Sequence, residues 1–102
     1  MQTVMTETTV KAGREKDWDN AFHDRAMDAR KQPGWVDLHL LIPQGDGRRR
    51  VVVGSWQDRL SWERWHETET FQRTREALND ATENHGEDRW FDVVEQQAKP
   101  SA

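Results

Sequence analysis

The sequence contains no cysteine, and this absence excludes several kinds of chemistry at once. Without thiols the chain cannot form disulfides, present a thiolate nucleophile, hold an iron–sulfur cluster or build a cysteine zinc site. Histidine spacings typical of zinc proteins are missing too, because neither HxH nor HExxH occurs. We therefore expect no metal site.

Long apolar segments and an excess of positive charge are also missing. The N-terminus MQTVMTETTV is short, polar and lacks the basic start of a secretory signal, and nothing resembles a membrane span. Fifteen basic and nineteen acidic residues give a net charge of -4, with both signs mixed along the chain. This balance argues against nucleic acid or an anionic membrane as the main partner. Because no signal peptide or membrane span is recognised, we expect a cytoplasmic protein.

Apolar residues are few for a chain of this size. Of the 102 residues, 33% are hydrophobic and 33% are charged, and the mean hydropathy is -1.12. Such a chain fits one domain near the lower end of sizes that fold alone. Six tryptophans raise the area buried per core residue, and burial against a second copy would raise it further. We therefore predict a homodimer.

Residue periodicity predicts alternating strands and helices. The expected elements are strands over 3–10, 35–42 and 48–56, helices over 14–31 and over 59–78 with a break at 66–70, a polar loop over 84–88, and a last strand over 89–95. This order is the split βαβ pattern of the ferredoxin-like α+β class, with helices on one face of an antiparallel sheet. We expect one domain over 1–96 and a frayed tail over 97–102.

The second strand carries bulk on both faces, so neither face is expected to be fully solvated. The sheet face without helices is then expected to meet a second protomer. The face predicted for that contact carries Trp35, Asp37, His39 and Leu41. His39 and Asp37 are either an acid and base pair within the resulting barrel or polar interface residues that satisfy each other.

The stretch from Val51 to Leu78 concentrates the large and ionisable side chains. A β-branched run ends at Trp56, Asp58 is placed to cap the following helix, and half of the six tryptophans lie in this stretch. The second helical piece aligns an aromatic, a cation and an aliphatic residue at i, i+4 and i+7. Such a concentration is either a dense core or the wall of a pocket.

The run WQDRLSWERW from Trp56 to Trp65, continuing to Phe71, resembles the signature of the antibiotic biosynthesis monooxygenase domain. That signature has a tryptophan closing the third strand, aromatic residues on the next helix and a short break before a phenylalanine. The stretches 10–15 and 32–35 are similar as well. The resemblance implies a dimeric α+β barrel, in which two ferredoxin-like protomers pack sheet against sheet and each keeps a cleft between helices and sheet.

The same resemblance implies several activities. Some members oxidise polycyclic phenols to quinones with oxygen and no metal or prosthetic group, some degrade haem, and others have no known reaction. The haem-degrading branch uses an asparagine, a tryptophan and an iron-ligating histidine at positions that here hold Thr6, Trp56 and Arg75. Because arginine cannot ligate ferric iron as imidazole does, haem degradation is the less favoured activity, and we expect no cofactor.

Two residues are candidates for the chemistry itself. His66 follows Trp65 at the helix break, where a neutral imidazole can take a phenolic or enolic proton. The alternative is an exposed or helix-end histidine beside Glu67. Arg75 lies between Phe71 and Leu78, where a permanent cation can hold a carboxylate, an enolate or a phenolate. The alternative is an arginine at the rim whose head reaches water. Residues predicted to contact substrate are Thr6, Trp56, Trp62 and Phe71.

Two functional hypotheses follow. The first is a cofactor-independent monooxygenase that acts on an aromatic or polyketide-like phenol or enol, with His66 as the base and Arg75 stabilising the anion. The alternative is a dimeric domain that holds a small ligand, or nothing, without turnover. A filled cleft, with the Arg75 head in solvent and Trp62 packed on Phe22, would favour it. Residues expected to be merely solvated are His23, His85 and the basic run 48–50, the last as protection of a sheet edge.

Overall fold

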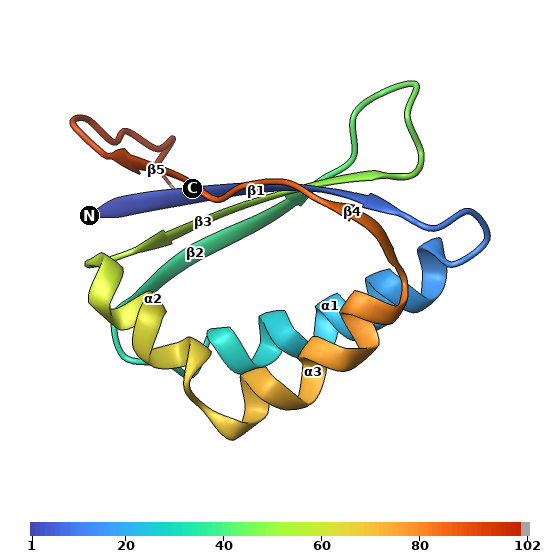
Figure 1. The fold of residues 1–102 in the computed structure, drawn as a ribbon. Helices are drawn as coiled ribbons and strands as arrows, with labels where there is room; N and C mark the ends of the chain where they lie inside the picture. The colour runs from blue at the N-terminus through green and yellow to red at the C-terminus, as the bar shows by residue number, and fades with distance from the viewer. Residues whose placement is uncertain (101–102) are drawn as a thin grey trace.

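Alternating side chains at the N-terminus form strand β1 (Gln2–Val10), which lies in the middle of an antiparallel sheet. The computed structural model describes residues 1–100. The other elements, in chain order, are α1 (Glu15–Ala29), β2 (Trp35–Leu41), β3 (Arg49–Trp56), α2 (Arg59–His66), α3 (Glu69–Asp80), β4 (Thr82–His85) and β5 (Arg89–Asp92). All three helices lie on one face of the sheet (Figure 1).

The sheet order is β2-β3-β1-β4, and β5 pairs with the same edge of β1 as β4 does. Strand β4 pairs with the end of β1 near Thr8, whereas β5 pairs with its beginning near Val4. The predicted ferredoxin-like arrangement, antiparallel with helices on one face, is therefore confirmed for the protomer. The dimeric barrel stays a prediction.

The C-terminal strand differs from its prediction because it is broken in two. Part of the predicted 84–88 loop belongs to β4, and β5 ends at Asp92, whereas the sequence pattern extended that strand to Glu95. At the break the Gly86 N–H donates to the Glu7 carbonyl at 2.8 Å, and a Cβ on Gly86 would lie 2.7 Å from that oxygen. Residues 93–100 form neither helix nor strand; of the predicted tail 97–102, positions 101 and 102 lie outside the described residues.

Strand β2 contains a register shift between Trp35 and Asp37. Because of this irregularity Trp35 packs against the buried cluster on the helical side, so its assignment to the same face as His39 was wrong. His39 and Leu41 remain on the face away from the helices, opposite Val53 and Val51 of β3.

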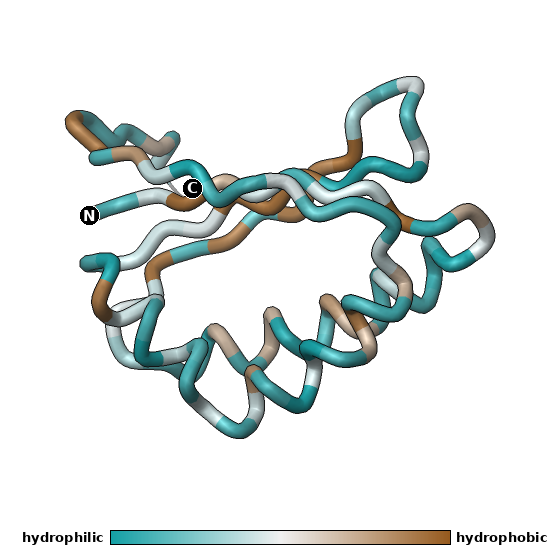
Figure 2. The backbone as a smooth tube through the Cα atoms, viewed as in Figure 1, coloured by the Kyte–Doolittle hydropathy of each residue, from teal (hydrophilic) through white to brown (hydrophobic). Residues whose placement is uncertain are grey.

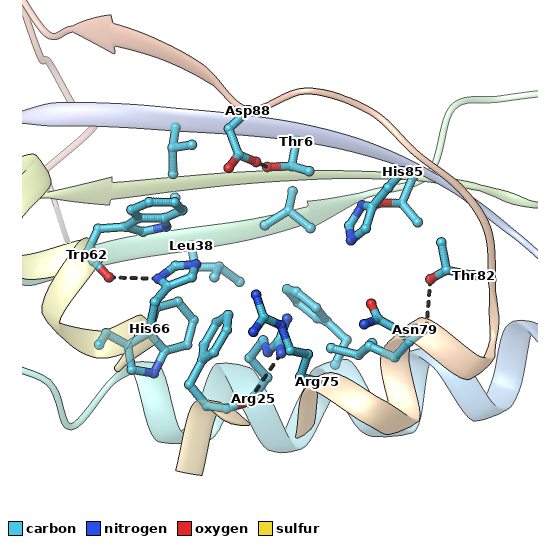
Figure 3. A pocket seen from close by; sticks show the side chains of 18 of the residues that line it. Thr6, Arg25, Leu38, Trp62, His66, Arg75, Asn79, Thr82, His85 and Asp88 are labelled. Carbon is cyan, nitrogen blue, oxygen red and sulfur yellow. Dashed lines mark hydrogen bonds between the residues drawn. The ribbon is translucent and has the colours of Figure 1, made fainter. Parts of the chain in front are cut away.

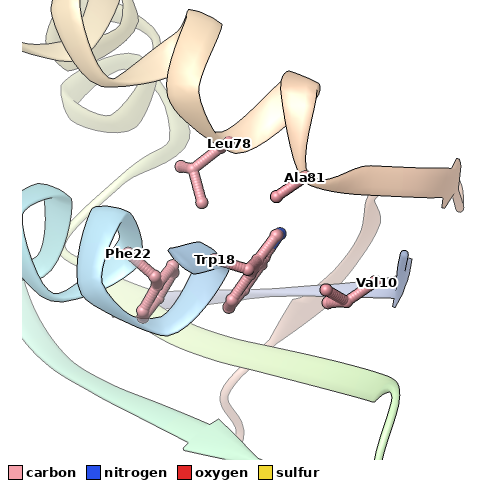
Figure 4. Packing of buried hydrophobic residues seen from close by; sticks show 5 residues of the cluster. All are labelled: Val10, Trp18, Phe22, Leu78 and Ala81. Carbon is pink, nitrogen blue, oxygen red and sulfur yellow. The ribbon is translucent and has the colours of Figure 1, made fainter. Parts of the chain in front are cut away.

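Two hydrophobic clusters fill the space between sheet and helices. The first cluster, shown in Figure 4, comprises Val10, Trp18, Phe22, Leu78 and Ala81. Within it the rings of Trp18 and Phe22 are stacked, with their centroids 5.1 Å apart. The second comprises Ala29, Trp56, Trp65 and Phe71. Figure 2 shows how few hydrophobic positions interrupt the hydrophilic helices. Within residues 1–100 no helix has the length and apolar character needed to cross a membrane.

An ion pair between a buried arginine and a partly exposed aspartate ties α1 to β3. Arg50 is only 3% exposed, and its guanidinium donates to both carboxylate oxygens of Asp19 at 2.8 and 3.1 Å and to the Gly47 carbonyl at 2.7 Å. The prediction that the whole basic run 48–50 is solvated was therefore wrong for Arg50. Its predicted role in protecting a sheet edge was also wrong, because β3 lies between β2 and β1. The bidentate partner on α1, distant in sequence, makes the burial of Arg50 tolerable.

Candidate functional site

A cavity of about 390 Å³ lies between the inner face of the sheet and the three helices. Its lining includes members of both hydrophobic clusters, such as Trp18 and Phe22 from the first and Trp56 and Phe71 from the second. Figure 3 shows polar side chains entering the cavity from the sheet above and from the helices below. The cavity is thus aromatic in its walls and charged at several points.

Side chains cap the starts of α2 and α3, and a carboxylate from α1 holds the break between them. The Asp58 carboxylate accepts from the Ser61 N–H at 2.8 Å, as the sequence predicts for the start of α2. Thr68 accepts from the Phe71 N–H at 3.3 Å at the start of α3. The Asp28 carboxylate on α1 accepts from Trp65 Nε1 at 2.9 Å and from Thr70 Oγ1 at 2.7 Å. These bonds hold the turn after His66 against α1.

His66 is half-buried at the end of α2, and one contact decides which of its ring nitrogens carries the proton in the neutral state. Its Nδ1 lies 2.8 Å from the Trp62 carbonyl oxygen, which can only accept, so Nδ1 carries a proton. In the neutral ring the lone pair is therefore on Nε2, the nitrogen on the cavity side (Figure 3). Burial lowers the pKa of His66 and outweighs the opposite effect of the Trp62 carbonyl, so the ring is neutral at pH 7.

Aromatic rings surround the imidazole. The Phe71 centroid is 4.0 Å from the His66 ring and 4.8 Å from the edge-on Trp65 ring. Trp56 is 1% exposed, and its ring centroid lies 5.3 Å from that of Trp65. These rings belong to the hydrophobic core and also form the wall of the cavity. Both alternatives for the tryptophan-rich stretch, a dense core and a pocket wall, therefore apply. A flat aromatic molecule is the ligand that such walls favour.

Two arginines face the cavity from the helices. Arg75 is exposed at the rim and donates to Gln72 Oε1 at 3.3 Å, so it both lines the cavity and reaches solvent. Arg25 of α1 is half-buried, with its guanidinium 3.9 Å from the Phe71 centroid and its Nε donating to Thr74 Oγ1 at 2.9 Å. Burial and then the charge of Arg75 lower the pKa of Arg25 to about 10, which leaves it a cation at neutral pH.

The sheet contributes polar groups on the opposite wall. Thr6 Oγ1 donates to Asp88 Oδ1 at 2.6 Å, and Thr8 Oγ1 shares a hydrogen bond of 3.3 Å with His85 Nδ1. The break between β4 and β5 places Asp88 and His85 beside the cavity. The sequence-based view of His85 as simply solvated was incomplete, because this exposed histidine lines the cavity.

All six residues predicted for the site line this one cavity: Thr6, Trp56, Trp62, His66, Phe71 and Arg75. Their roles stay predictions. Trp62 packs edge-on against Trp90 at 5.0 Å, whereas Phe22 stacks on Trp18, so the packing expected for a filled cleft is not found. Within residues 1–100 no group of three or more histidine and acidic side chains is arranged to hold a metal ion.

Among the ionisable residues of the lining, sequence reasoning missed three, namely Arg25, His85 and Asp88. Arg25 sits between Phe22 and Ala29 in the i, i+3, i+7 series that marks the buried side of α1, and this spacing is the signal that could have found it. No comparable signal exists for His85 and Asp88, because their place depends on how the broken strand pairs with β1.

Comparisons with known proteins found a matching family model and solved structures with a similar fold. The sequence model for antibiotic biosynthesis monooxygenases matches residues 1–77. The fold is similar to a crystal structure of an antibiotic biosynthesis monooxygenase, with a TM-score of 0.84, 21% identity and coverage of 93% of this chain and 100% of the other.

Two further solved structures share the fold. SnoaB, a cofactor-independent oxygenase from Streptomyces nogalater, aligns with a TM-score of 0.82, 23% identity and coverage of 98% of this chain and 97% of its own. A conserved protein from Methanosarcina mazei Go1 aligns with a TM-score of 0.82, 14% identity and coverage of 88% and 89%, respectively. No curated protein sequence matches the chain.

Proposed function

Because this chain belongs to the antibiotic biosynthesis monooxygenase family, we propose that its cavity binds an electron-rich aromatic phenol or enol and oxygenates it with O₂ and no cofactor. The observation that carries the proposal is the state of His66: a neutral imidazole, with its free Nε2 on the cavity side, stands among aromatic rings. The similarity to SnoaB, a cofactor-independent oxygenase, supports the same reaction class.

Proton abstraction is the first step. His66 Nε2 takes a proton from the acidic C–H or O–H of the substrate, and the Nδ1–H bond to the Trp62 carbonyl stabilises the imidazolium that forms. The substrate becomes an electron-rich anion. Arg75 at the rim and Arg25 beside Phe71 lower the energy of that anion electrostatically. Trp56, Trp62 and Phe71 limit water around it.

Oxygen reacts with the bound anion in the second step. The carbanion passes one electron to O₂, and the resulting pair combines into a C–O bond as a peroxide anion. The imidazolium of His66 returns its proton to give a hydroperoxide, which loses water and leaves a carbonyl. For a methylene substrate the balance is CH₂ plus O₂ giving C=O plus H₂O, so the oxygen molecule is the whole oxidant.

Haem degradation is less favoured by the residues present. The positions that resemble the asparagine and the iron-ligating histidine of haem-degrading relatives hold Thr6 and Arg75. Thr6 is engaged with Asp88, and a guanidinium does not ligate ferric iron.

An oxygen-uptake assay with dithranol, a dihydroxyanthrone, tests the proposed function. The protein is expected to accelerate its conversion to the anthraquinone, followed by an oxygen electrode and mass spectrometry. His66→Gln is expected to lower kcat by about 10² to 10⁴, the usual contribution of a general base, while leaving anaerobic binding nearly unchanged. His23→Gln, which alters an exposed histidine of α1, is the matched control.

Two outcomes would contradict the proposal. Unchanged turnover in His66→Gln would remove the assigned base. Tight anaerobic binding of flat phenols with no oxygen uptake above buffer would instead support the dimeric ligand-binding domain.

A further inference from the structure

The cavity holds more positive charge than its own residues compensate. Arg25 and Arg75 both line it, and neither is a partner in any of the ion pairs formed within residues 1–100. Their hydrogen bonds go to neutral acceptors, namely Thr74 Oγ1, the Phe71 carbonyl and Gln72 Oε1. The two charges also repel each other, since Arg75 contributes to the lowered pKa of Arg25.

Acidic groups near the cavity are committed elsewhere. In the described part of the chain Asp88 is the only acidic residue of the lining; it lies on the sheet wall and accepts from Thr6. Asp28, one turn beyond Arg25 on α1, directs its carboxylate to Trp65 and Thr70. With two arginines and one aspartate, and the histidines counted as neutral, the described lining carries a net charge of +1.

The proposed reaction does not supply a compensating negative charge. When His66 takes a proton from the substrate, the imidazolium and the new anion form together, so the total charge of the complex stays the same. The excess charge of Arg25 and Arg75 is present before, during and after this step. A half-buried cation without an anion is unfavourable, so a negative charge on the ligand would stabilise the complex.

From this charge balance, and resting on the proposed function, we propose that the substrate carries a carboxylate separate from its oxidised ring position, held by Arg25 with Arg75 at the rim. One excess positive charge matches a monoanion, and the planar guanidinium matches a planar carboxylate. The Arg25 guanidinium and the His66 ring lie 3.9 and 4.0 Å from the same Phe71 centroid, hence within about 8 Å of each other. A single aromatic ligand can therefore approach both groups.

A matched set of naphthalenes tests the proposal without requiring turnover. The probes are 5-hydroxy-1-naphthoate, its primary amide and 1-naphthol, with binding followed under nitrogen by quenching of tryptophan fluorescence. The acid is expected to bind the wild-type protein about tenfold more tightly than the amide, because hydrogen bonds to a charged acceptor are stronger than those to a neutral one. Added salt is expected to weaken binding of the acid alone.

Substitutions show which arginines cause the preference for the acid over the amide. Arg25→Gln is expected to abolish it, and Arg75→Gln to reduce it about threefold, since that side chain is exposed and screened. Arg73→Gln, on the same helix but outside the cavity lining, makes the same change in net charge and is expected to keep the preference. If Arg25→Gln folds poorly, the exposed Arg75→Gln variant still tests whether the preference for the acid depends on an arginine of the cavity.

Three results would overturn the proposal: equal affinity for acid and amide, an acid preference unchanged in both arginine variants, or no binding of any probe at millimolar concentration. The proposed function fails separately. Acid-selective binding without oxygen uptake would leave the carboxylate site and remove the oxygenase, whereas oxygenation of dithranol without acid preference would do the reverse.

Discussion

At the scale of single residues, His66 couples the stability of this protein to pH. Burial lowers its pKa in the folded state below the ordinary value of 6.5. Between these two pKa values the unfolded chain binds more protons than the folded one, so stability is lost as the pH falls through this window. His66→Gln is therefore expected to lose less stability than the wild-type protein between pH 7.5 and pH 5.5.

Thermal melts of both proteins across that range measure the difference. Parallel loss of Tm in the wild-type and His66→Gln proteins would contradict the assignment of a depressed pKa to this ring. His23→Gln is the control for simple removal of a histidine, since His23 is exposed.

Asp28 carries a second prediction at this scale. Its carboxylate accepts from the N–H of Trp65, a residue that is 5% exposed, and from the hydroxyl of Thr70. Asp28→Ala leaves that buried indole N–H without an acceptor and is expected to lower the free energy of unfolding by about 1–3 kcal/mol. Urea titration measures it. Asp24→Ala, an exposed acid one turn earlier, should change stability little, and equal effects of the two substitutions would argue against a specific role.

Charged residues mark the limit of what the sequence predicts about the site. The aromatic residues and His66 could be assigned to a cavity wall because they cluster in one stretch. The spacing on α1 places Arg25 on the buried side, but its contact with Phe71 could not be predicted. Arg50 could not be separated from the solvated charges around it, because its burial depends on Asp19, a partner far away in sequence. A single sequence gives residue spacing along an element, but it does not give partners across elements.

At the scale of elements, Gly34 sets how closely the start of β2 approaches helix α2. It has φ of +86°, and a Cβ there would lie 2.6 Å from Ser61 Cβ and closer still to Ser61 Oγ. Gly34→Ala is expected to cost about 2–4 kcal/mol, combining left-handed backbone strain with overpacking. The displaced helix carries Trp62 and His66, so ligand affinity should fall as well.

Chemical denaturation tests this contact, with Gly13 as the matched control. Gly13 has φ of +81° but no atom within 4 Å of an added Cβ, so Gly13→Ala should cost only about 1–2 kcal/mol of backbone strain. In a double-mutant cycle, Ser61→Gly should recover part of the loss caused by Gly34→Ala. Strict additivity of the two substitutions would contradict the proposed close approach.

The elements with strong periodicity were predictable, and those without it were not. Strand β1, helix α1 and the α2–α3 break follow from residue spacing, and the start of α2 follows from the cap at Asp58. Strand β4, with the sequence TENH, has no alternation of apolar residues and exists because β1 offers it an edge. The irregularity that turns Trp35 inward is likewise a property of pairing with β3.

At the scale of the whole molecule, the sheet has one face covered by helices and one that is not. On strand β3 the inward residues Val52 and Gly54 line the cavity, so Val53 between them points to the other face. There Val53 lies opposite Met5 of β1 and His39 of β2. An apolar position at the centre of an uncovered sheet is what the predicted sheet-to-sheet homodimer would bury.

Val53→Lys tests that homodimer. We expect the wild-type protein to have twice the mass of one chain by light scattering at micromolar concentration. The substitution places an ammonium at the centre of each protomer's contact face, and a two-fold interface would bury two of them without partners. Burying an unpaired charge costs several kcal/mol, so the dimer Kd should rise by at least about a hundredfold while the circular dichroism spectrum is retained. Ala77→Lys adds the same charge at an exposed position of α3 and should stay dimeric. A monomeric wild-type protein, or a dimer that survives Val53→Lys, would rule out association through this face.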